Sequence, residues 1–197
     1  MTGVLIAFEG LDQSGKQTQA EGVHDEALSR GRECRLLSFP DYTTPIGSEI
    51  GKALQGERDY GADVMQLMYV ANRHERRDEM RQWLERGVVV VCDRYIASSI
   101  AYGEAQGLDA AWLAEIQRFL PAPDLTILLD IAPETAVRRK ASGRDRYERD
   151  LRLLSRVRDS YRRQAASGGW LLVDGERSRE AVSRDIVTAV STRLGRR

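Results

Sequence analysis

The sequence has little cysteine and histidine and no excess of charge of either sign. It contains two cysteines and two histidines, and its 30 lysine and arginine residues balance 30 aspartate and glutamate residues. Cys34 and Cys92 lack zinc-ligand spacing and lie in apolar runs, so we expect buried free thiols. His24 and His74 have polar neighbours on expected helices, and we expect surface residues. These features argue against a zinc domain, a disulfide scaffold and a nucleic-acid partner.

Long hydrophobic runs are also missing. The first apolar run, Val4 to Phe8, is too short for a signal peptide or a membrane span. Hydrophobic residues make up 42% of the 197 residues and charged residues 30%, which indicates neither a disordered chain nor a membrane protein. We therefore expect one compact cytoplasmic domain over residues 1–197, without a membrane partner.

Short apolar runs alternate with helical patterns along the chain. Runs rich in β-branched residues indicate strands covered on both faces. They span Val4 to Phe8, Arg35 to Phe39, Val88 to Cys92, Leu125 to Asp130 and, more weakly, Trp170 to Val173. Between them, helical spacing is seen for Val64, Leu67, Met68 and Ala71, extended by Met80, Trp83 and Leu84, then for Leu154, Val157 and Tyr161, and finally for Ala181, Ile186, Val187 and Val190. This order predicts an α/β fold with a doubly wound, five-stranded parallel sheet flanked by helices.

A phosphate-binding pattern directly follows the first predicted strand. Gly10 and Gly15 stand five residues apart, and Lys16 comes next at the start of a predicted helix. The glycines let backbone N–H groups face an anion, while the helix N-terminus and Lys16 add positive charge for the phosphates of ATP. The alternative is a glycine-rich turn that binds nothing. The residues that we predict to bind ATP are Gly10, Gln13, Ser14, Gly15, Lys16, Gln17 and Thr18.

The residue after Lys16 departs from this pattern. A serine or threonine hydroxyl normally stands there to bind Mg²⁺, whereas this chain has Gln17. Thr18 lies one place later and is a weaker candidate for a metal ligand. Charge that develops on a transferred phosphoryl group still requires a metal, so we expect Mg²⁺ as the cofactor.

Positive charge is concentrated in residues 138–149, which we call the lid. Six basic residues stand there against two acidic ones: Arg138, Arg139, Lys140, Arg144, Arg146 and Arg149 against Asp145 and Glu148. In a chain of zero net charge, this concentration indicates a local function, and we expect the segment to be a mobile insert in the single domain. The alternative is a solvated charged loop.

Further motifs occur in a characteristic order. They are Gly10-Leu11-Asp12 with Gly15-Lys16, Phe39-Pro40-Asp41-Tyr42, Ala71-Asn72-Arg73, Asp93-Arg94-Tyr95, Ala101-Tyr102, Leu129-Asp130 with Pro133-Glu134, Arg146-Tyr147-Glu148 and Val173-Asp174-Gly175. Together they resemble the thymidylate kinase family of P-loop nucleoside monophosphate kinases, from about Leu5 to Val190. The resemblance implies a P-loop kinase fold with an arginine-rich lid, and transfer of the γ-phosphoryl group of ATP to dTMP.

The resemblance also implies a dTMP site. Asp12 would hold the 3′-hydroxyl of the sugar, and Tyr102 would crowd its 2′ position and favour deoxyribose. Tyr69 would stack on thymine, and Arg73 would contact the base. From the residues alone, Asp12 could instead cap a helix, and the two tyrosines could be packing residues. The full set of predicted dTMP-binding residues is Asp12, Phe39, Pro40, Tyr69, Arg73, Arg94, Ser98 and Tyr102.

Catalytic roles follow from the same resemblance. Arg94 would hold the acceptor phosphate, and Asp93 would lie near Mg²⁺ through water, although it could also cap the next helix. The Phe-Pro motif of the family often continues with arginine, but here Asp41 follows, and Gln13 leaves the phosphate loop without an arginine. The lid would then supply the missing charge. The predicted catalytic residues are Lys16, Arg94, Arg144 and Arg146.

Two other functions remain open from the sequence. One is a kinase for another acceptor, such as dUMP or UMP, and the other is a nucleotide-binding switch without an acceptor pocket. The family is commonly homodimeric, and the predicted helix from Ala62 to Arg86 could supply an apolar face for a second copy.

Overall fold

A five-stranded parallel sheet forms the centre of the computed structural model, which describes residues 3–139 and 150–195. The strands are β1 Val4–Glu9, β2 Cys34–Ser38, β3 Val89–Asp93, β4 Leu125–Asp130 and β5 Leu171–Asp174. The helices are α1 Lys16–Ser29, α2 Pro45–Gln55, α3 Ala62–Glu85, α4 Ile96–Ala105, α5 Ala110–Glu115, α6 Pro133–Arg139, α7 Leu151–Gly168 and α8 Arg179–Gly195. Every strand begins and ends within one residue of its predicted bounds. The predicted α/β fold is confirmed.

The strand order is β2-β3-β1-β4-β5, which places β1 in the middle of the sheet. Phe8 of β1 pairs with Asp93 of β3, and Glu9 pairs with Leu128 of β4. All pairs are parallel, so the carboxyl ends of these strands meet at one edge. Open α/β sheets bind ligands at this edge, beside the strand where the chain order reverses.

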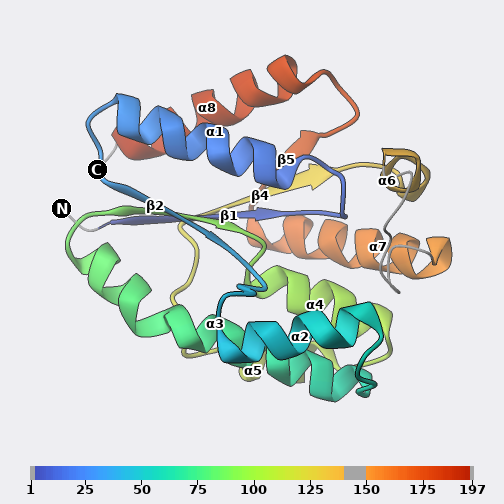
Figure 1. Ribbon diagram of the computed structural model, residues 1–197. Coiled ribbons are helices and arrows are strands. Elements are labelled where there is room, and N and C mark those ends of the chain that lie inside the picture. Colours follow the sequence, from blue (N-terminus) through green and yellow to red (C-terminus); the bar gives the residue numbers. More distant parts are fainter. Residues whose placement is uncertain (1–2, 140–149, 196–197) are drawn as a thin grey trace.

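Helices cover both faces of the sheet (Figure 1). Helices α1 and α8 pack together on one face, while α3, α4 and α7 lie on the other. Along β1, Ile6 and Phe8 belong to the core under α1 and α8, whereas Leu5 and Ala7 belong to the core shared with α3. Burial on both faces explains why the strands are continuous apolar runs.

Helix α3 buries only part of the stripe that its sequence predicts: Met80 is wholly buried, and Met68, Trp83 and Leu84 are partly buried. Val64 and Leu67 are 39% and 46% exposed. The buried face instead mixes apolar and polar residues: Met65, Gln66, Val70, Asn72, Arg73 and Met80. The prediction was wrong for Val64 and Leu67 because it assumed a wholly apolar inward face, whereas this helix turns several polar groups inward to a pocket and a loop.

Two predictions about isolated residue types can be compared with the fold. Cys34 and Cys92 are buried free thiols, as predicted. His24 on α1 and His74 on α3 are both partly exposed at the protein surface. In the described ranges, 3–139 and 150–195, no helix is long and apolar enough to cross a membrane.

Candidate active site

The phosphate loop joins β1 to α1 through three residues with positive φ. Gly10 and Gly15 have φ of 138° and 96°, and Gln13 has φ of 62°. A Cβ atom on Gly10 would lie 2.4 Å from the carbonyl oxygen of Leu129, so only glycine fits there. Ser14 is buried, and its hydroxyl has no hydrogen-bond partner among the described residues. The predicted glycine roles therefore agree with the backbone of this loop.

Lys16 begins α1 and turns back over the loop. It is 5% exposed, and its Nζ donates a hydrogen bond to the carbonyl oxygen of Leu11 at 2.8 Å. Burial, followed by the nearby charge of Arg94, lowers the pKa of Lys16 to about 8 against smaller opposing effects of Asp12 and Asp93. An anion bound to the loop would favour the charged ammonium.

Arg94 connects β3 to the phosphate loop. Its φ is 64°, a left-handed conformation that is uncommon outside glycine, and its backbone N–H donates to the carbonyl oxygen of Phe8 at 2.9 Å. Backbone strain of this kind often marks a functional position. The guanidinium donates to oxygen atoms of Asp12 at 2.6 Å, and of Gly10, Ser98 and Tyr161 at 3.2 Å each.

Asp12 faces Arg94 rather than capping α1. Gly15 occupies the N-cap position of that helix. Oδ2 of Asp12 also accepts a hydrogen bond from the hydroxyl of Tyr102 at 3.1 Å. Burial alone would raise the pKa of Asp12, but Arg94 and then Lys16 outweigh burial and hold the pKa well below its usual range. The carboxylate therefore stays ionised and available to accept a further hydrogen bond.

A buried carboxylate under this site was missed from the sequence. Glu9 is wholly buried at the end of β1, and its Oε2 accepts from the hydroxyls of Ser98 at 2.6 Å and Tyr161 at 3.2 Å. Its Oε1 accepts from the backbone N–H of Tyr95 at 2.9 Å. Tyr161 comes from α7, and the sequence pattern treats it as a core residue. The proton of the Ser98 hydroxyl is directed to Glu9, so Ser98 can offer an acceptor but not this donor to a ligand.

A pocket lies beside Arg94, with about 560 Å³ of empty space when the part open to solvent is included. All eight residues predicted to bind dTMP line it: Asp12, Phe39, Pro40, Tyr69, Arg73, Arg94, Ser98 and Tyr102. Tyr42, which belongs to the Phe-Pro motif but was not predicted to bind dTMP, also lines it. The sequence did not single out the remaining lining residues, which are Leu54, Gln66, Ser99 and Gln106.

Arg73 is a buried cation in this pocket. It is 3% exposed, and its Nη1 donates to Ser99 at 2.7 Å and Gln117 at 3.2 Å, while Nε has no partner among the described residues. No ion pair joins Arg73 to a carboxylate in the described part of the chain. Burial lowers its pKa, against an opposing effect of Glu9. A buried guanidinium held by neutral groups can still donate to a neutral ligand.

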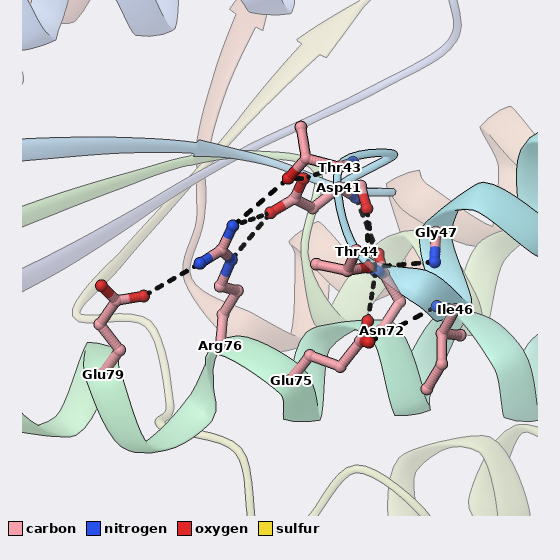
Figure 2. Close-up of polar contacts among 9 residues, drawn as sticks. All are labelled: Asp41, Thr43, Thr44, Ile46, Gly47, Asn72, Glu75, Arg76 and Glu79. Carbon is pink, nitrogen blue, oxygen red and sulfur yellow. Dashed lines mark hydrogen bonds and ion pairs between the residues drawn. The ribbon is translucent and has the colours of Figure 1, made fainter.

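The loop after β2 is fastened to α3 by polar contacts (Figure 2). Asn72 accepts from the backbone N–H of Asp41 at 2.8 Å and donates to the carbonyl oxygen of Asp41 at 3.2 Å and to Thr44 at 2.8 Å. The carboxylate of Asp41 pairs with Arg76 at 2.7 Å and accepts from Thr43 at 2.6 Å. Asp41 does not line the pocket, and its carboxylate instead stabilises the loop that carries Phe39 and Pro40.

The remaining predicted site residues are the candidate ATP and metal ligands Gln17, Thr18 and Asp93 and the lid arginines. Gln17 is exposed and donates to Glu21 at 2.9 Å, and Thr18 is half-buried on α1. Oδ1 of Asp93 is buried without a hydrogen-bond partner in the described part of the chain, and Tyr95, not Asp93, is the N-cap of α4. Arg144 and Arg146 lie outside the described residues.

The described end of the lid contacts the phosphate loop. Arg139 donates to the carbonyl oxygen of Gln13 at 3.2 Å and to that of Gly175 at 2.9 Å. It therefore joins the end of α6 to the loop after β1 and to the loop after β5. The sequence places Arg139 in the lid but gives no sign of these partners.

Comparisons with known proteins agree on one family. A family model described as thymidylate kinase matches residues 8–186. The thymidylate kinase of Schizosaccharomyces pombe is 35% identical over 195 residues, covering 96% of this chain and 92% of the relative. Human thymidylate kinase is 32% identical over 191 residues, covering 93% of this chain and 88% of the relative. The solved structure of thymidylate kinase from Candida albicans has a TM-score of 0.80 at 30% identity and covers 98% of this chain and 92% of its own. The chain belongs to the thymidylate kinase family, and it is an ATP-dependent nucleoside monophosphate kinase.

Proposed function

We propose that this protein transfers the γ-phosphoryl group of ATP to dTMP, giving dTDP and ADP. The observation that carries the proposal is the position of Arg94, which contacts the phosphate loop at Gly10 and also lines the adjoining pocket. ATP bound at the phosphate loop and dTMP bound in the pocket would meet at this residue. The acceptor oxygen is an anionic phosphate oxygen, so the transfer needs positioning and charge neutralisation more than a general base.

Each group near the pocket has a role in this proposal. Lys16 neutralises charge on the donor phosphates, and Arg94 holds the acceptor phosphate. Asp12 accepts a hydrogen bond from the 3′-hydroxyl of the dTMP sugar. Tyr102, which donates a hydrogen bond to Asp12, fills the space beside the 2′ position of that sugar. Tyr69 stacks on the base, and Arg73 donates to a carbonyl oxygen of thymine.

Mg²⁺ fits the free oxygen atoms beside the phosphate loop. Oδ1 of Asp93 and Oγ of Ser14 are buried without hydrogen-bond partners among the described residues. Carboxylate and hydroxyl oxygens are suitable Mg²⁺ ligands, directly or through water. No cluster of three or more histidine, cysteine, aspartate or glutamate side chains that could hold a metal occurs in the described part of the chain. When bound, the ion would neutralise charge on the transferred phosphoryl group.

The lid arginines Arg144 and Arg146 complete the proposed catalytic set on sequence grounds. The phosphate loop carries Gln13 where an arginine could stand, and the carboxylate of Asp41 pairs with Arg76. We propose that the lid supplies charge for the transition state in their place. We also place the enzyme in the cytoplasm, where the two buried cysteines would remain free thiols.

One coupled assay tests the proposed reaction. ADP release from ATP is measured with dTMP, dUMP, UMP or no acceptor, with and without Mg²⁺. We expect Mg²⁺-dependent release with dTMP at a kcat/KM well above that with UMP. Equal release with and without an acceptor would contradict the kinase function, and a preference for UMP would contradict dTMP as the acceptor.

A homodimer through α3 is also part of this proposal. Val64 and Leu67 form an exposed apolar strip on this helix. A second copy would cover the strip and remove it from water. Light scattering during size-exclusion chromatography tests this with Leu67→Glu, and Leu28→Glu on α1 is a matched control because Leu28 is 47% exposed. We expect a dimer for the wild type and the control, and a monomer for Leu67→Glu. A monomeric wild type would contradict the dimer.

A further inference from the structure

One side chain in the acceptor pocket has no partner for either of its polar atoms. Gln66 is 1% exposed and lines the pocket, yet neither Nε2 nor Oε1 forms a hydrogen bond with the described residues. Two nearby amides differ from it. Gln106 donates to the carbonyl oxygen of Tyr102 at 2.8 Å, and Gln117 donates to that of Leu113 at 2.9 Å. Gln66 is therefore the unsatisfied amide of this pocket among the described residues.

An unpaired buried amide destabilises a protein, and most native amides in such positions have partners. The fold nevertheless holds Gln66 in place. A Cβ atom on Gly103 would lie 3.3 Å from Cγ of Gln66 and 2.6 Å from Cδ1 of Leu113, so a glycine on α4 leaves room for the stem of Gln66. A packed stem with a free carboxamide indicates a group that is kept ready for a ligand.

The position of Gln66 on α3 points to the base of the nucleotide. Gln66, Tyr69 and Arg73 have i, i+3 and i+7 spacing, which places them on one face of the helix, and all three line the pocket. Arg73 offers donors only, whereas Gln66 offers one donor group and one acceptor. The edge of thymine carries carbonyl acceptors on either side of a ring N–H donor. The two side chains together match such an edge.

We propose that Gln66 reads the hydrogen-bonding edge of the pyrimidine, with Oε1 accepting from the ring N–H and Nε2 donating to an adjoining carbonyl oxygen. This inference rests on the proposed acceptor, dTMP. The carbonyl at position 4 of thymine would face Arg73, which leaves the ring N–H and the carbonyl at position 2 for Gln66. Cytosine would place an amine against Arg73, which cannot accept from it, and an unprotonated ring nitrogen against Oε1, which cannot donate to it. The pair therefore selects thymine and uracil against cytosine.

The test is Gln66→Met, which keeps the volume of the side chain and removes the amide. Removing an unpaired buried amide should raise the melting temperature of the unliganded protein, while the further rise produced by dTMP should become smaller. We expect kcat/KM for dTMP and for dUMP to fall by about tenfold, through KM, and kcat/KM for dCMP to change little. A purely structural role would not produce opposite changes in the unliganded and liganded proteins.

Two further variants complete the experiment. Gln66→Asn keeps an amide on a side chain that is shorter by one methylene group. We expect the same fall in kcat/KM for dTMP as in Gln66→Met, and no rise in the melting temperature of the unliganded protein. Gln82→Met makes the same chemical change at an exposed position of α3 and should alter neither quantity.

The outcomes separate this inference from the proposed function. A wild-type protein that releases no ADP with dTMP contradicts the proposed function before any variant is made. If the wild type uses dTMP and Gln66→Met keeps its dTMP-to-dCMP ratio within twofold, or melts at a lower temperature without ligand, the inference about Gln66 is wrong.

Discussion

The guanidinium of Arg94 lies 2.6 Å from a carboxylate oxygen of Asp12, and this pair links the end of β3 to the phosphate loop after β1. Both groups are mostly shielded from water, since the Arg94 side chain is 14% exposed and that of Asp12 is 33% exposed. In the proposed function, an acceptor phosphate would therefore share Arg94 with a carboxylate that is already in place. The carboxylate keeps the arginine oriented. Because Nη1 already donates to Gly10, Ser98 and Tyr161, the phosphate would share or displace some of these contacts.

Arg94→Lys keeps the positive charge beside Asp12 but loses the planar fork that contacts several oxygen atoms. We expect kcat/KM for dTMP to fall by about 10²–10³-fold, because one ammonium group cannot hold Asp12 and the acceptor phosphate together. Steady-state kinetics with a parallel thermal melt measures this. Arg30→Lys, in a surface ion pair with Glu26, is the matched control. A loss below threefold would remove Arg94 from the catalytic set.

Tyr161→Phe tests how α7 supports Arg94. The hydroxyl of Tyr161 is 2.8 Å from that of Ser98 and also contacts Arg94 and Glu9. Without it, Glu9 loses a donor and Arg94 loses an acceptor, so we expect a destabilisation of about 1–3 kcal/mol and a fall in kcat of about tenfold. Denaturant unfolding and kinetics give the two values. Tyr60→Phe is the matched control, because the hydroxyl of Tyr60 donates to Glu49 and Tyr60 does not line the pocket, and it should leave kcat unchanged.

Asn72→Ala tests the fastening of the loop after β2 (Figure 2). The side chain of Asn72 is fully buried and joins α3 to Asp41 and Thr44. Its removal leaves several backbone and side-chain groups unpaired, so we expect a loss of about 2–4 kcal/mol in unfolding free energy. The KM for dTMP should also rise, because Phe39 and Pro40 belong to the same loop. An unchanged KM in a destabilised variant would limit Asn72 to a structural role.

The lowered pKa of Lys16 predicts two opposite dependences on pH. In the nucleotide-free protein this pKa is about 8, against 10.5 for an unperturbed lysine. ATP affinity should fall as pH rises through about 8, because the ammonium that faces the phosphates is lost. Folding stability should rise over the same pH range and up to about 10.5, because the unfolded chain then binds the extra proton. Calorimetric titration and thermal melts from pH 7 to 10 measure both. Lys16→Met should abolish the Lys16 contribution to each, and identical slopes in the two proteins would contradict the prediction.

Arg144→Ala and Arg146→Ala test the lid, which is assigned from the sequence. We expect kcat to fall by about 10²–10³-fold with little change in the binding of ATP and dTMP, as for a group that acts on the transition state. Gln13→Arg should restore part of the loss if the two positions serve the same phosphates. If both lid variants keep kcat within about threefold of the wild type, a loss below about 1 kcal/mol, the lid is a solvated loop.

The strands and the phosphate loop could be predicted from the sequence because local chemistry determines them. A continuous β-branched run can be buried on both faces only inside such a sheet, and Gly10 has no room for a side chain. The eight predicted pocket residues were placed by their resemblance to a family rather than by periodicity. Their meeting in one pocket depends on strand order, which the sequence patterns did not specify.

Burial on α3 and α7 was harder to predict, for a physical reason. Helical periodicity assumes that inward means apolar, and α3 turns Gln66, Asn72 and Arg73 inward while Leu67 faces outward. Tyr161 has the spacing of a core residue, and its ring is indeed buried. The polar role of its hydroxyl comes from a hydrogen bond to Glu9, which lies 152 residues earlier in the chain. Such pairings depend on packing between distant segments.

The pocket has a simple origin along the chain. Apart from Asp12, every residue that lines it lies between Phe39 and Gln106. Lys16 and the rest of the phosphate loop lie outside this stretch, as do β4, β5 and α8. If the pocket binds the acceptor as proposed, one continuous stretch of about a third of the chain would hold nearly all the residues that choose the acceptor. A duplicated gene could acquire a new acceptor by changes within that stretch and inherit its use of ATP intact.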